Sequence, residues 1–314
     1  MSRLEWALVA FLVVQILLWL SVEFNKPERS AQSEQSRILI NVDVGTVRRI
    51  ELQDGKKPLI FELRDEEWRN SAVEEFPINQ EQVKSFLAKI ANLKRGLGVS
   101  VSQSSHSRFG VSEDNPVLKV VLTTETDTEF AIFFGKSSTI RESYARAAGE
   151  TTVFAVKMES WELNSSADHW LDKTYLELEE EDVLSASING LDFEKKDNRY
   201  HFRNMPTEEY DSKKIQIFVR DLLKVRAESF VLENEAATQV EKFEEFFVVD
   251  TVGRVEIVFL VASVVEGETT TYFVKRGDKK GVYKVPTYQI KKLIDAKLED
   301  FLLDGVVEKA TSEG

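Results

Sequence analysis

The same order of apolar and polar positions occurs twice along the chain, at a constant spacing of 132 positions. Matching residue types recur in a strand-like segment, at a helix start and along a helix face. The clearest pairs are Phe61 with Phe193, Asp65 with Asp197, Trp68 with Tyr200, Asn79 with Asp211, and Phe86 with Phe218. Self-similarity at one fixed spacing is typical of a duplicated folding unit. The pattern therefore predicts two tandem copies of one unit.

The first copy contains short runs rich in Val, Ile, Phe and Thr, which are separated by polar turns and favour strands. These runs are 38–44, 47–53, 58–64, 117–124, 129–136, 144–148 and 152–157. A helix is predicted after Asn79, which can cap it, with Gln82 placed as in a capping box. A second helix, over 159–171, closes the unit.

The second copy repeats this order of elements. Its strand-like runs are 244–251, 255–265, 269–276 and 282–285. Asp211 is predicted to cap the first helix, and a helix over 287–303 closes the unit. Strands that follow one another through short turns pair as hairpins, so both sheets should be mainly antiparallel. The predicted fold class is therefore α+β, with two tandem duplicated units.

A run with almost no polar side chains, from Leu4 to Val22, precedes the first copy. As a helix of 19 residues it would be about 28 Å long, which is enough to span a bilayer. Trp6 and Trp19 suit the two headgroup layers. We therefore predict a single-pass transmembrane anchor over 1–24. A cleaved signal peptide and a buried soluble helix are the alternatives, but no pair of small residues follows the run to form a cleavage site.

Residues 25–37 contain almost nothing to bury and are predicted to form a flexible tether. The rest of the chain divides into a first unit over 38–175, a second unit over 176–304 and a tail over 305–314. The Lys and Arg residues on either side of the anchor do not settle its orientation. We place the large C-terminal region outside the membrane, because long domains translocate largely regardless of charge.

Composition narrows the function classes. The chain has 314 residues, a formal net charge of −13 and no cysteine. This length suits two domains. The negative charge argues against nucleic acid as a partner, because phosphate binding needs an excess of Lys and Arg. A chain without cysteine has no disulfides, thiolate metal sites or cysteine nucleophiles.

The sequence contains two weak patterns for a phosphate or cofactor site. Gly96-Leu97-Gly98 is half of a dinucleotide fingerprint, without the third glycine or the preceding strand. Gly135-Lys136-Ser137 resembles the end of a P-loop, but the position that needs the first glycine of that motif is Phe130. We interpret the triplet as a turn after a strand. The sequence predicts no cofactor.

The candidates for metal binding and catalysis are equally weak. The three histidines, His106, His169 and His201, stand in unrelated sequence contexts. The nearest cluster is Asp168-His169 followed by Asp172, which we interpret as a helix end. We therefore predict no metal site, no catalytic residue and no enzymatic activity.

Short motifs occur in a fixed order along the first copy. They are Trp68, the helix 83–93, Arg108-Phe109-Gly110-Val111, Phe134-Gly135, Tyr144-Ala145-Arg146, Val153-Phe154-Ala155-Val156 and Trp170-Leu171-Asp172-Lys173. In this order they resemble the bacterial family called domain of unknown function 4340. Seven positions are singled out as family motif positions of unknown role: Trp68, Phe109, Gly110, Tyr144, Arg146, Asp172 and Lys173. The second copy lacks the glycine and the arginine of two motifs, so a site in those turns is expected in the first unit only.

The resemblance implies a membrane-anchored protein with an exported region, associated with ABC-type transport components like those of gliding-motility systems. It also implies that the membrane is a bacterial inner membrane and that the large C-terminal region is periplasmic. It implies no reaction. We therefore expect a non-enzymatic accessory or scaffold protein whose partners are proteins, among them a transporter permease or associated exported proteins. The alternative is an envelope sensor or ligand-binding module that holds a small molecule or glycan between the units. An envelope enzyme is a third interpretation, which would need converging acids or histidines in a pocket.

Overall fold

The computed structural model describes residues 15, 38–253 and 255–303 of the chain. In these described ranges no helix is long and apolar enough to cross a membrane. The predicted anchor with Leu4, Trp6, Trp19 and Val22 lies outside them, Gln15 aside, as do the tether and the tail.

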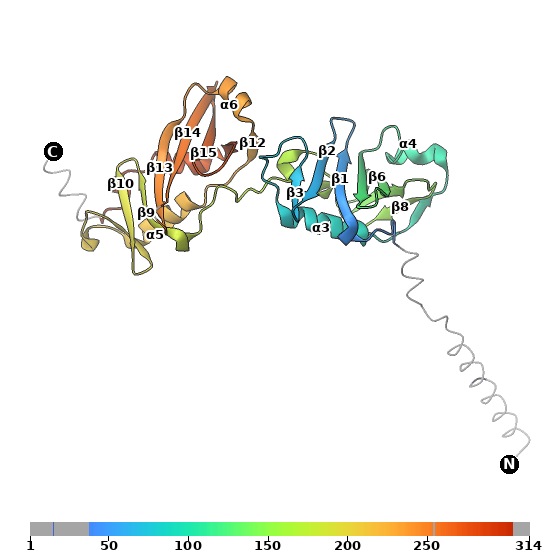
Figure 1. Ribbon diagram of the computed structural model, residues 1–314, viewed down its shortest axis with the longest axis horizontal. Helices are drawn as coiled ribbons and strands as arrows, with labels where there is room; N and C mark the ends of the chain where they lie inside the picture. Colours follow the sequence, from blue (N-terminus) through green and yellow to red (C-terminus); the bar gives the residue numbers. More distant parts are fainter. Residues whose placement is uncertain (1–14, 16–37, 254, 304–314) are drawn as a thin grey trace, which may run out of the picture.

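The first unit contains an eight-stranded antiparallel sheet in the order β3-β2-β1-β5-β6-β7-β8-β4 (Figure 1). Its strands are β1 Val47–Gln53, β2 Leu59–Arg64, β3 Glu67–Asn70, β4 Gly98–Ser100, β5 Leu118–Thr124, β6 Glu129–Thr139, β7 Glu142–Ala147 and β8 Val153–Val156. Helix α3 (Gln80–Ala91) covers one face, and the short helix α4 (His106–Phe109) covers the β6–β8 part of the other. Successive residues of a strand point to opposite faces, so this sheet has a core on each side.

The second unit repeats this topology, with an eight-stranded sheet in the order β11-β10-β9-β13-β14-β15-β16-β12. Its strands are β9 Val183–Ile188, β10 Leu191–Lys196, β11 Arg199–Phe202, β12 Ser229–Val231, β13 Glu244–Thr251, β14 Glu256–Glu266, β15 Thr269–Arg276 and β16 Val282–Val285. Its helices are α5 Ser212–Leu223, α6 Glu233–Gln239 and α7 Thr287–Ile294. The identical strand order confirms two tandem α+β units with antiparallel sheets. The predicted unit boundaries stay a prediction.

The two long helices begin and pack as their sequences predict. The side chain of Asn79 accepts a hydrogen bond from the backbone N–H of Gln82, and that of Asp211 accepts from Lys213 and Lys214. The apolar face of each helix is buried against its sheet. Full burial of one such side chain contributes roughly 1.5–3 kcal/mol, so this face is the main source of each helix's stability.

One aromatic residue from the end of each unit completes the core between helix and sheet. In the first unit Trp170 packs edge-on against Phe61 and Phe86, at centroid distances of 5.5 and 5.1 Å. In the second unit Phe301 packs in the same way against Phe193 and Phe218, at 6.2 and 5.1 Å. Trp170 is 1% exposed and Phe301 is 4% exposed. The duplication therefore extends to the closing segment of each unit.

The prediction of a helix over 159–171 is wrong. This segment forms two short 3₁₀ turns, Ser160–Glu162 and Ala167–His169. Between them the Asn164 side chain accepts from the backbone N–H of Ser166, 2.8 Å away, an alternative to helical bonding that Asn and Ser side chains favour. The turn also lets the indole N–H of Trp170 donate to the Asn164 carbonyl at 2.9 Å.

Four smaller predictions also need correction. The helix over 287–303 ends at Ile294, because Phe301 must leave the helix axis to enter the core. The run 38–44 is not a strand: it makes one bridge, at Ile38, before the Asp43 side chain bonds the N–H of Gly45 and turns the chain.

The capping box at Asn79 is not formed, since the Gln82 side chain donates instead to the carbonyl of His169 at 3.0 Å. The triplet 135–137 is not a turn but lies inside β6.

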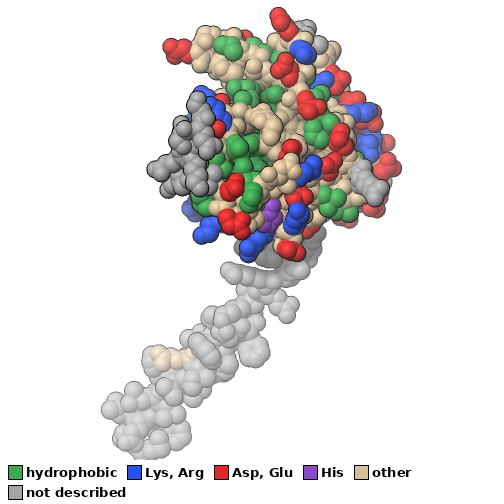
Figure 2. All heavy atoms as spheres, turned by 90° about the vertical axis from the view of Figure 1, so that its left-hand side faces the viewer, with side chains coloured by type: hydrophobic (Ala, Val, Ile, Leu, Met, Phe, Trp, Pro, Cys, Tyr) green, Lys and Arg blue, Asp and Glu red, His purple; other side chains and the backbone are tan. Residues whose placement is uncertain are grey.

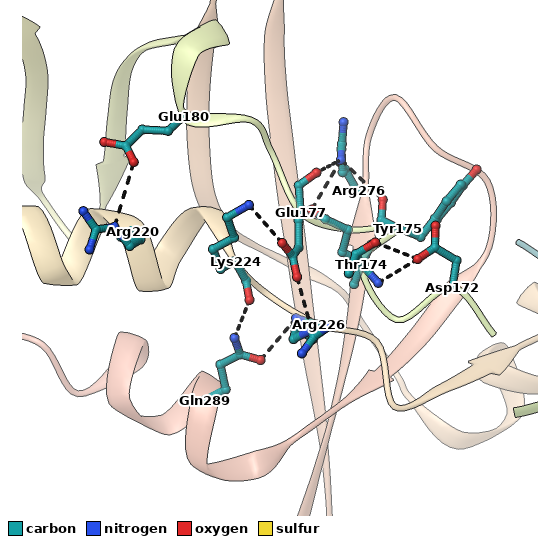
Figure 3. Close-up of polar contacts among 11 residues, drawn as sticks. Asp172, Thr174, Tyr175, Glu177, Glu180, Arg220, Lys224, Arg226, Arg276 and Gln289 are labelled. Carbon is teal, nitrogen blue, oxygen red and sulfur yellow. Dashed lines mark hydrogen bonds and ion pairs between the residues drawn. The ribbon is translucent and has the colours of Figure 1, made fainter. Parts of the chain in front are cut away.

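The segment that joins the units is bonded to the second unit along its length (Figure 3). The buried guanidinium of Arg276 donates through Nη1 to the carbonyls of Tyr175, Leu176 and Glu177, at 3.4, 3.3 and 2.8 Å. The Glu177 carboxylate lies 3.0 Å from the ammonium of Lys224 and 3.2 Å from the guanidinium of Arg226. Leu176 and Leu178 are buried beside these contacts. The joining segment is therefore part of the second unit's packed structure.

Two buried tyrosines provide a stability test within the second unit. The hydroxyl of Tyr200 has no hydrogen-bond partner among the described residues, whereas that of Tyr283 donates to the Lys280 carbonyl at 2.8 Å. Burial raises the pKa of both tyrosines well above the ordinary value. Removing an unsatisfied hydroxyl relieves its desolvation cost, so Tyr200→Phe should gain about 1 kcal/mol of unfolding free energy. Tyr283→Phe should lose about 1 kcal/mol in the same urea titration. Equal losses in the two variants would contradict this assignment.

Candidate functional site

The structure brings four of the seven family motif positions together. Phe109, Gly110, Tyr144 and Arg146 lie on the outer face of the first sheet, in the small core beneath α4. Phe109 and Tyr144 make an edge-to-face pair with centroids 4.7 Å apart. The other three positions lie elsewhere: Trp68 is on β3, and Asp172 with Lys173 is where the chain leaves the first unit.

Arg146 ties the loop after α4 to the sheet. Its side chain is 3% exposed, and its Nε and Nη2 donate to the carbonyl of Val111 at 3.1 and 3.0 Å. Its Nη1 donates to the carbonyl of Glu150 at 2.9 Å, and the guanidinium stacks 4.5 Å from the centre of the Phe133 ring. These backbone acceptors and the aromatic ring satisfy a buried cation. Arg146 therefore has a structural role: it holds the loop after α4 against the sheet.

Gly110 and Gly135 meet where the loop approaches β6. Gly110 ends α4 in the left-handed region, with φ of 74°, which only glycine adopts without strain. A Cβ on Gly135 would lie 2.0 Å from the carbonyl oxygen of Phe109. The two glycines are therefore required by close packing of backbone on backbone. The P-loop-like triplet noted in the sequence owes its glycine to this contact.

The outermost strand on one side of each sheet is closed by a glutamine side chain. In the first unit the amide of Gln80 accepts from the N–H of Trp68 and donates to its carbonyl, at 2.8 and 2.9 Å. In the second unit the amide of Gln216 bonds Tyr200 in the same way, at 3.0 and 2.7 Å. A side-chain amide here replaces the neighbouring strand that an edge would otherwise recruit.

The opposite edge of the second sheet is closed by the first unit. The N–H of Phe230, in the middle of β12, donates to the Asp168 carboxylate at 3.3 Å. Phe76 of the first unit packs against the Phe230 ring at a centroid distance of 5.5 Å. A backbone bond from Ala227 to the carbonyl of Lys173, 2.9 Å long, joins the units beside this contact. The junction between the units therefore occupies the β12 edge.

The remaining edge, at β4, is left open by the residues that the structure describes. We call residues 97–101 the β4 edge. No side chain of the described residues bonds the backbone of Gly98, Val99 or Ser100 on the side away from β8. The residues flanking the strand, Leu97 and Val101, are apolar and 76% and 75% exposed. Three outer strands are thus closed and one is open, and the open one has exposed apolar side chains at both ends.

The motif cluster supports the β4 edge from below. Val99 packs against the small core of Phe109, Val111, Phe133 and Val153. A Cβ on Gly96 would lie 1.9 Å from the carbonyl of Ala155, so the chain entering the strand is held close to β8. The motif positions under α4 therefore fix the strand that carries the open edge.

Asp168 at the junction should make stability depend on pH. Burial raises the pKa of its carboxyl above the ordinary value of 3.8, although the Phe230 N–H and nearby Lys173 and Lys284 act in the opposite direction. Because the pKa is raised in the folded state, the contribution of Asp168 to the free energy of unfolding is fully present below pH 3.8. It is lost as the pH rises through the folded-state pKa.

We expect Asp168→Asn to be more stable than the parent at pH 7, because the neutral amide still accepts from Phe230 without the cost of burying a charge. This difference should shrink towards pH 4. Urea unfolding at both pH values measures it, with Asp172→Asn as the control, since among the described residues the Asp172 side chain accepts hydrogen bonds only from the nearby Thr174. A difference that grows towards acid would contradict the prediction.

The histidines are held in separate structural contacts. His106 is buried and its Nε2 lies 2.8 Å from the Thr151 carbonyl oxygen. His201 Nδ1 lies 3.1 Å from the Tyr210 hydroxyl, and His169 packs edge-on against Trp170. The candidate cluster at Asp168 is not brought together, because Asp168 bonds Phe230 while Asp172 caps Thr174. Among the described residues no group of three or more His, Cys, Asp or Glu is placed to hold a metal ion.

The fold and the site together define a two-unit α+β protein. The first unit closes the β12 edge of the second unit, while its own equivalent edge, at β4, is left open by the described residues. The chain belongs to the family described as domain of unknown function (DUF4340), whose model matches residues 68–245. The match begins at Trp68, includes all seven motif positions and extends into the second unit. No curated protein and no solved structure matches the chain.

Sequence reasoning missed the residues that close the edges. Gln80 and Gln216 do the same task but do not occupy equivalent positions in the repeat, since Gln216 stands one helical turn further along its helix. A comparison of the two copies by position therefore hides them. The one signal available in the sequence is the polar glutamine side chain on the part of each helix that faces the edge strand.

Proposed function

We propose that the protein is a non-enzymatic accessory or scaffold subunit, anchored in the inner membrane by the apolar run Leu4–Val22, with both units in the periplasm. The run is long enough to span a bilayer. The family resemblance supports an ABC-type transport complex of the gliding-motility kind as its setting. In this proposal the partners are a permease or associated exported proteins.

The observation that carries the proposal is the open β4 edge. An exposed strand edge binds an extended segment of a partner through main-chain hydrogen bonds, and flanking apolar side chains add contact area. The edge also lies near the start of the first unit, because the carbonyl of Ile38 accepts from Arg95, which stands just before the strand. A partner bound at β4 would thus sit close to the point where the predicted tether enters the first unit.

The binding test replaces both flanking residues with lysine, as Leu97→Lys with Val101→Lys. Lysine on an edge strand opposes strand addition. Both side chains are at least 75% exposed, so stability should change by less than about 0.5 kcal/mol. Affinity capture of the full chain from gently solubilised membranes should recover an identified permease-type protein with the parent and lose it with the variant.

The matched control is Ile140→Lys, which changes an equally exposed apolar residue, 89% accessible, in the β6–β7 hairpin. It should keep the partner. Capture that survives the double lysine change, or is lost equally in the control, would exclude the β4 edge as the binding surface. A C-terminal reporter fusion that is active only in the cytoplasm would exclude the periplasmic placement independently.

One observation favours the ligand-binding alternative. A cleft of about 460 Å³ lies between the units, lined by Glu75 of the first unit and by Phe230, Glu233, Asn234 and Lys280 of the second. Glu75 and Lys280 approach to 3.9 Å across it. Such a mixture of one aromatic ring with charged and amide groups suits a small polar molecule or glycan. Thermal-shift screening with such molecules should find a ligand whose effect Asn234→Ala removes; no stabilising ligand would count against this function.

A further inference from the structure

The outer strands β4 and β12 occupy equivalent positions in the two units. Gly98 of β4 lies opposite Phe154 of β8, and Phe230 of β12 lies opposite Tyr283 of β16. Gly98 and Phe230 are also 132 positions apart, which is the spacing of the repeat. The group that closes β12 within the chain is therefore a guide to what β4 binds.

Gly98 turns its backbone polar groups away from the sheet. The N–H of Ala155 donates to the carbonyl of Leu97 at 2.9 Å. In an antiparallel ladder such a bond flanks a pair of residues that exchange no hydrogen bond with each other, here Gly98 and Phe154. The N–H and the carbonyl of Gly98 therefore point to the open side of the strand, where the described part of the chain supplies no partner.

The equivalent N–H in the second unit is bonded to a carboxylate. The Phe230 N–H donates to Oδ1 of Asp168 at 3.3 Å. Asp168 stands in a 3₁₀ turn of the first unit and does not belong to the sheet whose edge it closes. The chain thus satisfies an outward N–H of this strand with an acidic side chain from a neighbouring body, and a charged acceptor makes the stronger hydrogen bond.

Gly98 leaves room for such a side chain to approach. A Cβ at this position would meet its nearest neighbours, a methyl of Thr152 and the ring of Phe154, at 3.7 and 3.9 Å. In β12 the corresponding space is filled by the Phe230 ring, which packs on Tyr283 at a centroid distance of 5.6 Å. The outward N–H of β4 is therefore less shielded than that of β12.

The charge beside the β4 edge favours an acidic partner. No Asp or Glu occurs from 82 to 112, a range that contains the whole edge and the chain on both sides of it. Lys94 and Arg95 stand directly before the strand, and Lys157 directly follows β8. Arg95 is paired with Glu150 at 2.5 Å. The surplus charge next to the edge is therefore positive.

The second unit does not share this absence of acids. Its matching range, 214–244, contains six: Asp221, Glu228, Glu233, Glu235, Glu241 and Glu244. Figure 2 views the molecule from the end formed by the second unit and shows Asp and Glu side chains spread over that surface. The acid-free stretch is thus particular to the unit whose edge is open, where it spares a negatively charged partner from repulsion.

We propose that the β4 edge binds a partner segment that carries an aspartate or glutamate opposite Gly98. The carboxylate would accept from the Gly98 N–H, as that of Asp168 accepts from Phe230, and the basic residues beside the strand would favour its charge. The flanking residues of the segment would lie on Leu97 and Val101. This inference rests on the function proposed above and adds the chemistry of the partner to it.

The test uses the full chain in nanodiscs of phosphatidylcholine and capped five-residue peptides as probes. Calorimetry compares Thr-Val-Asp-Val-Thr with the peptides that carry Asn or Lys at the centre. The Asp peptide should bind about tenfold more tightly than the Asn peptide, because a charged acceptor makes a hydrogen bond about twice as strong as a neutral one. The Lys peptide should bind most weakly. Added salt should reduce the preference for Asp over Asn, because it screens the charge of the exposed site.

Two variants of one residue locate the contact. Gly98→Pro removes the N–H, and proline is accepted on an edge strand where the N–H faces outward, so the variant should fold. Urea unfolding checks this. The Asp and Asn peptides should bind equally to Gly98→Pro. Gly98→Ala keeps the N–H and should keep the preference for Asp.

The outcomes separate this inference from the function on which it rests. Equal binding of the Asp and Asn peptides to the parent, or a preference that persists in Gly98→Pro, would overturn the acidic chemistry and leave the edge as a binding surface. No binding of any peptide at millimolar concentration would overturn the edge itself. If Gly98→Pro did not fold, the preference of the parent and its loss in salt would decide. Self-association of the full chain that Gly98→Pro abolishes and Gly98→Ala keeps would assign the edge to a second copy instead.

Discussion

Arg146→Ala should lower the unfolding free energy of the first unit by about 3–5 kcal/mol, the size expected when a buried charged hydrogen-bonding network is broken. Three hydrogen bonds to the carbonyls of Val111 and Glu150 would be lost, and the buried Val111 carbonyl would lose both of its donors. The stacking on Phe133 would go as well. Equilibrium urea unfolding of the full chain, followed by tryptophan fluorescence, measures the loss.

The matched control is Arg108→Ala. Arg108 also lies over an aromatic ring, that of Phe109 at 5.2 Å, but it is exposed and bonds no carbonyl among the described residues. Its replacement should cost less than about 0.5 kcal/mol. If both arginine variants lost the same stability, the assigned role of Arg146, holding the loop after α4 against the sheet, would be wrong. Arg146→Ala should also weaken partner capture, because the loop that supports Val99 would loosen.

Gly135→Ala should have the second largest effect, a loss of about 3 kcal/mol. The new methyl group would lie 2.0 Å from the Phe109 carbonyl oxygen and 2.8 Å from a methyl of Val111. The first of these contacts is with backbone, so it can be relieved only by moving the loop after α4 away from β6. Such a shift would pull the Val111 carbonyl from Arg146.

Gly98→Ala is the control for this second variant. A Cβ at Gly98 would meet its nearest neighbour, a methyl of Thr152, at 3.7 Å, which is ordinary van der Waals contact. This variant should unfold within about 0.5 kcal/mol of the parent. Urea unfolding in which Gly135→Ala is as stable as Gly98→Ala would show that the loop is free to move and is not held by the two-glycine contact.

The parts of the fold that depend on local chemistry were predictable from the sequence. The repeat of apolar positions predicted two α+β units, and the identical strand order of the two sheets confirms them. Asn79 and Asp211 cap the helices because an Asn or Asp side chain bonds the N–H groups of the next few residues wherever a helix follows. Three strands of the second unit, β13, β15 and β16, have the predicted bounds.

The parts that depend on contacts between distant segments were not predictable. The run 159–171 was predicted to be a helix, but its path is set by the contacts of Trp170 with Phe61 and Phe86. The open β4 edge is defined by what closes the other three, and those groups stand 12, 16 and 62 positions away along the chain. Local periodicity carries no information about such distances. The candidate site therefore emerges only from the tertiary structure.

The carbonyls of Tyr175, Leu176 and Glu177 are held by one arginine of the second unit, while Asp168, a few residues earlier, is held by the β12 edge. These attachments leave little free chain between the units. Relative rotation of the units would have to break several of these bonds together. The protein should thus behave as a spacer of fixed length. Two partners, one bound to each unit, would keep a constant distance and relative orientation.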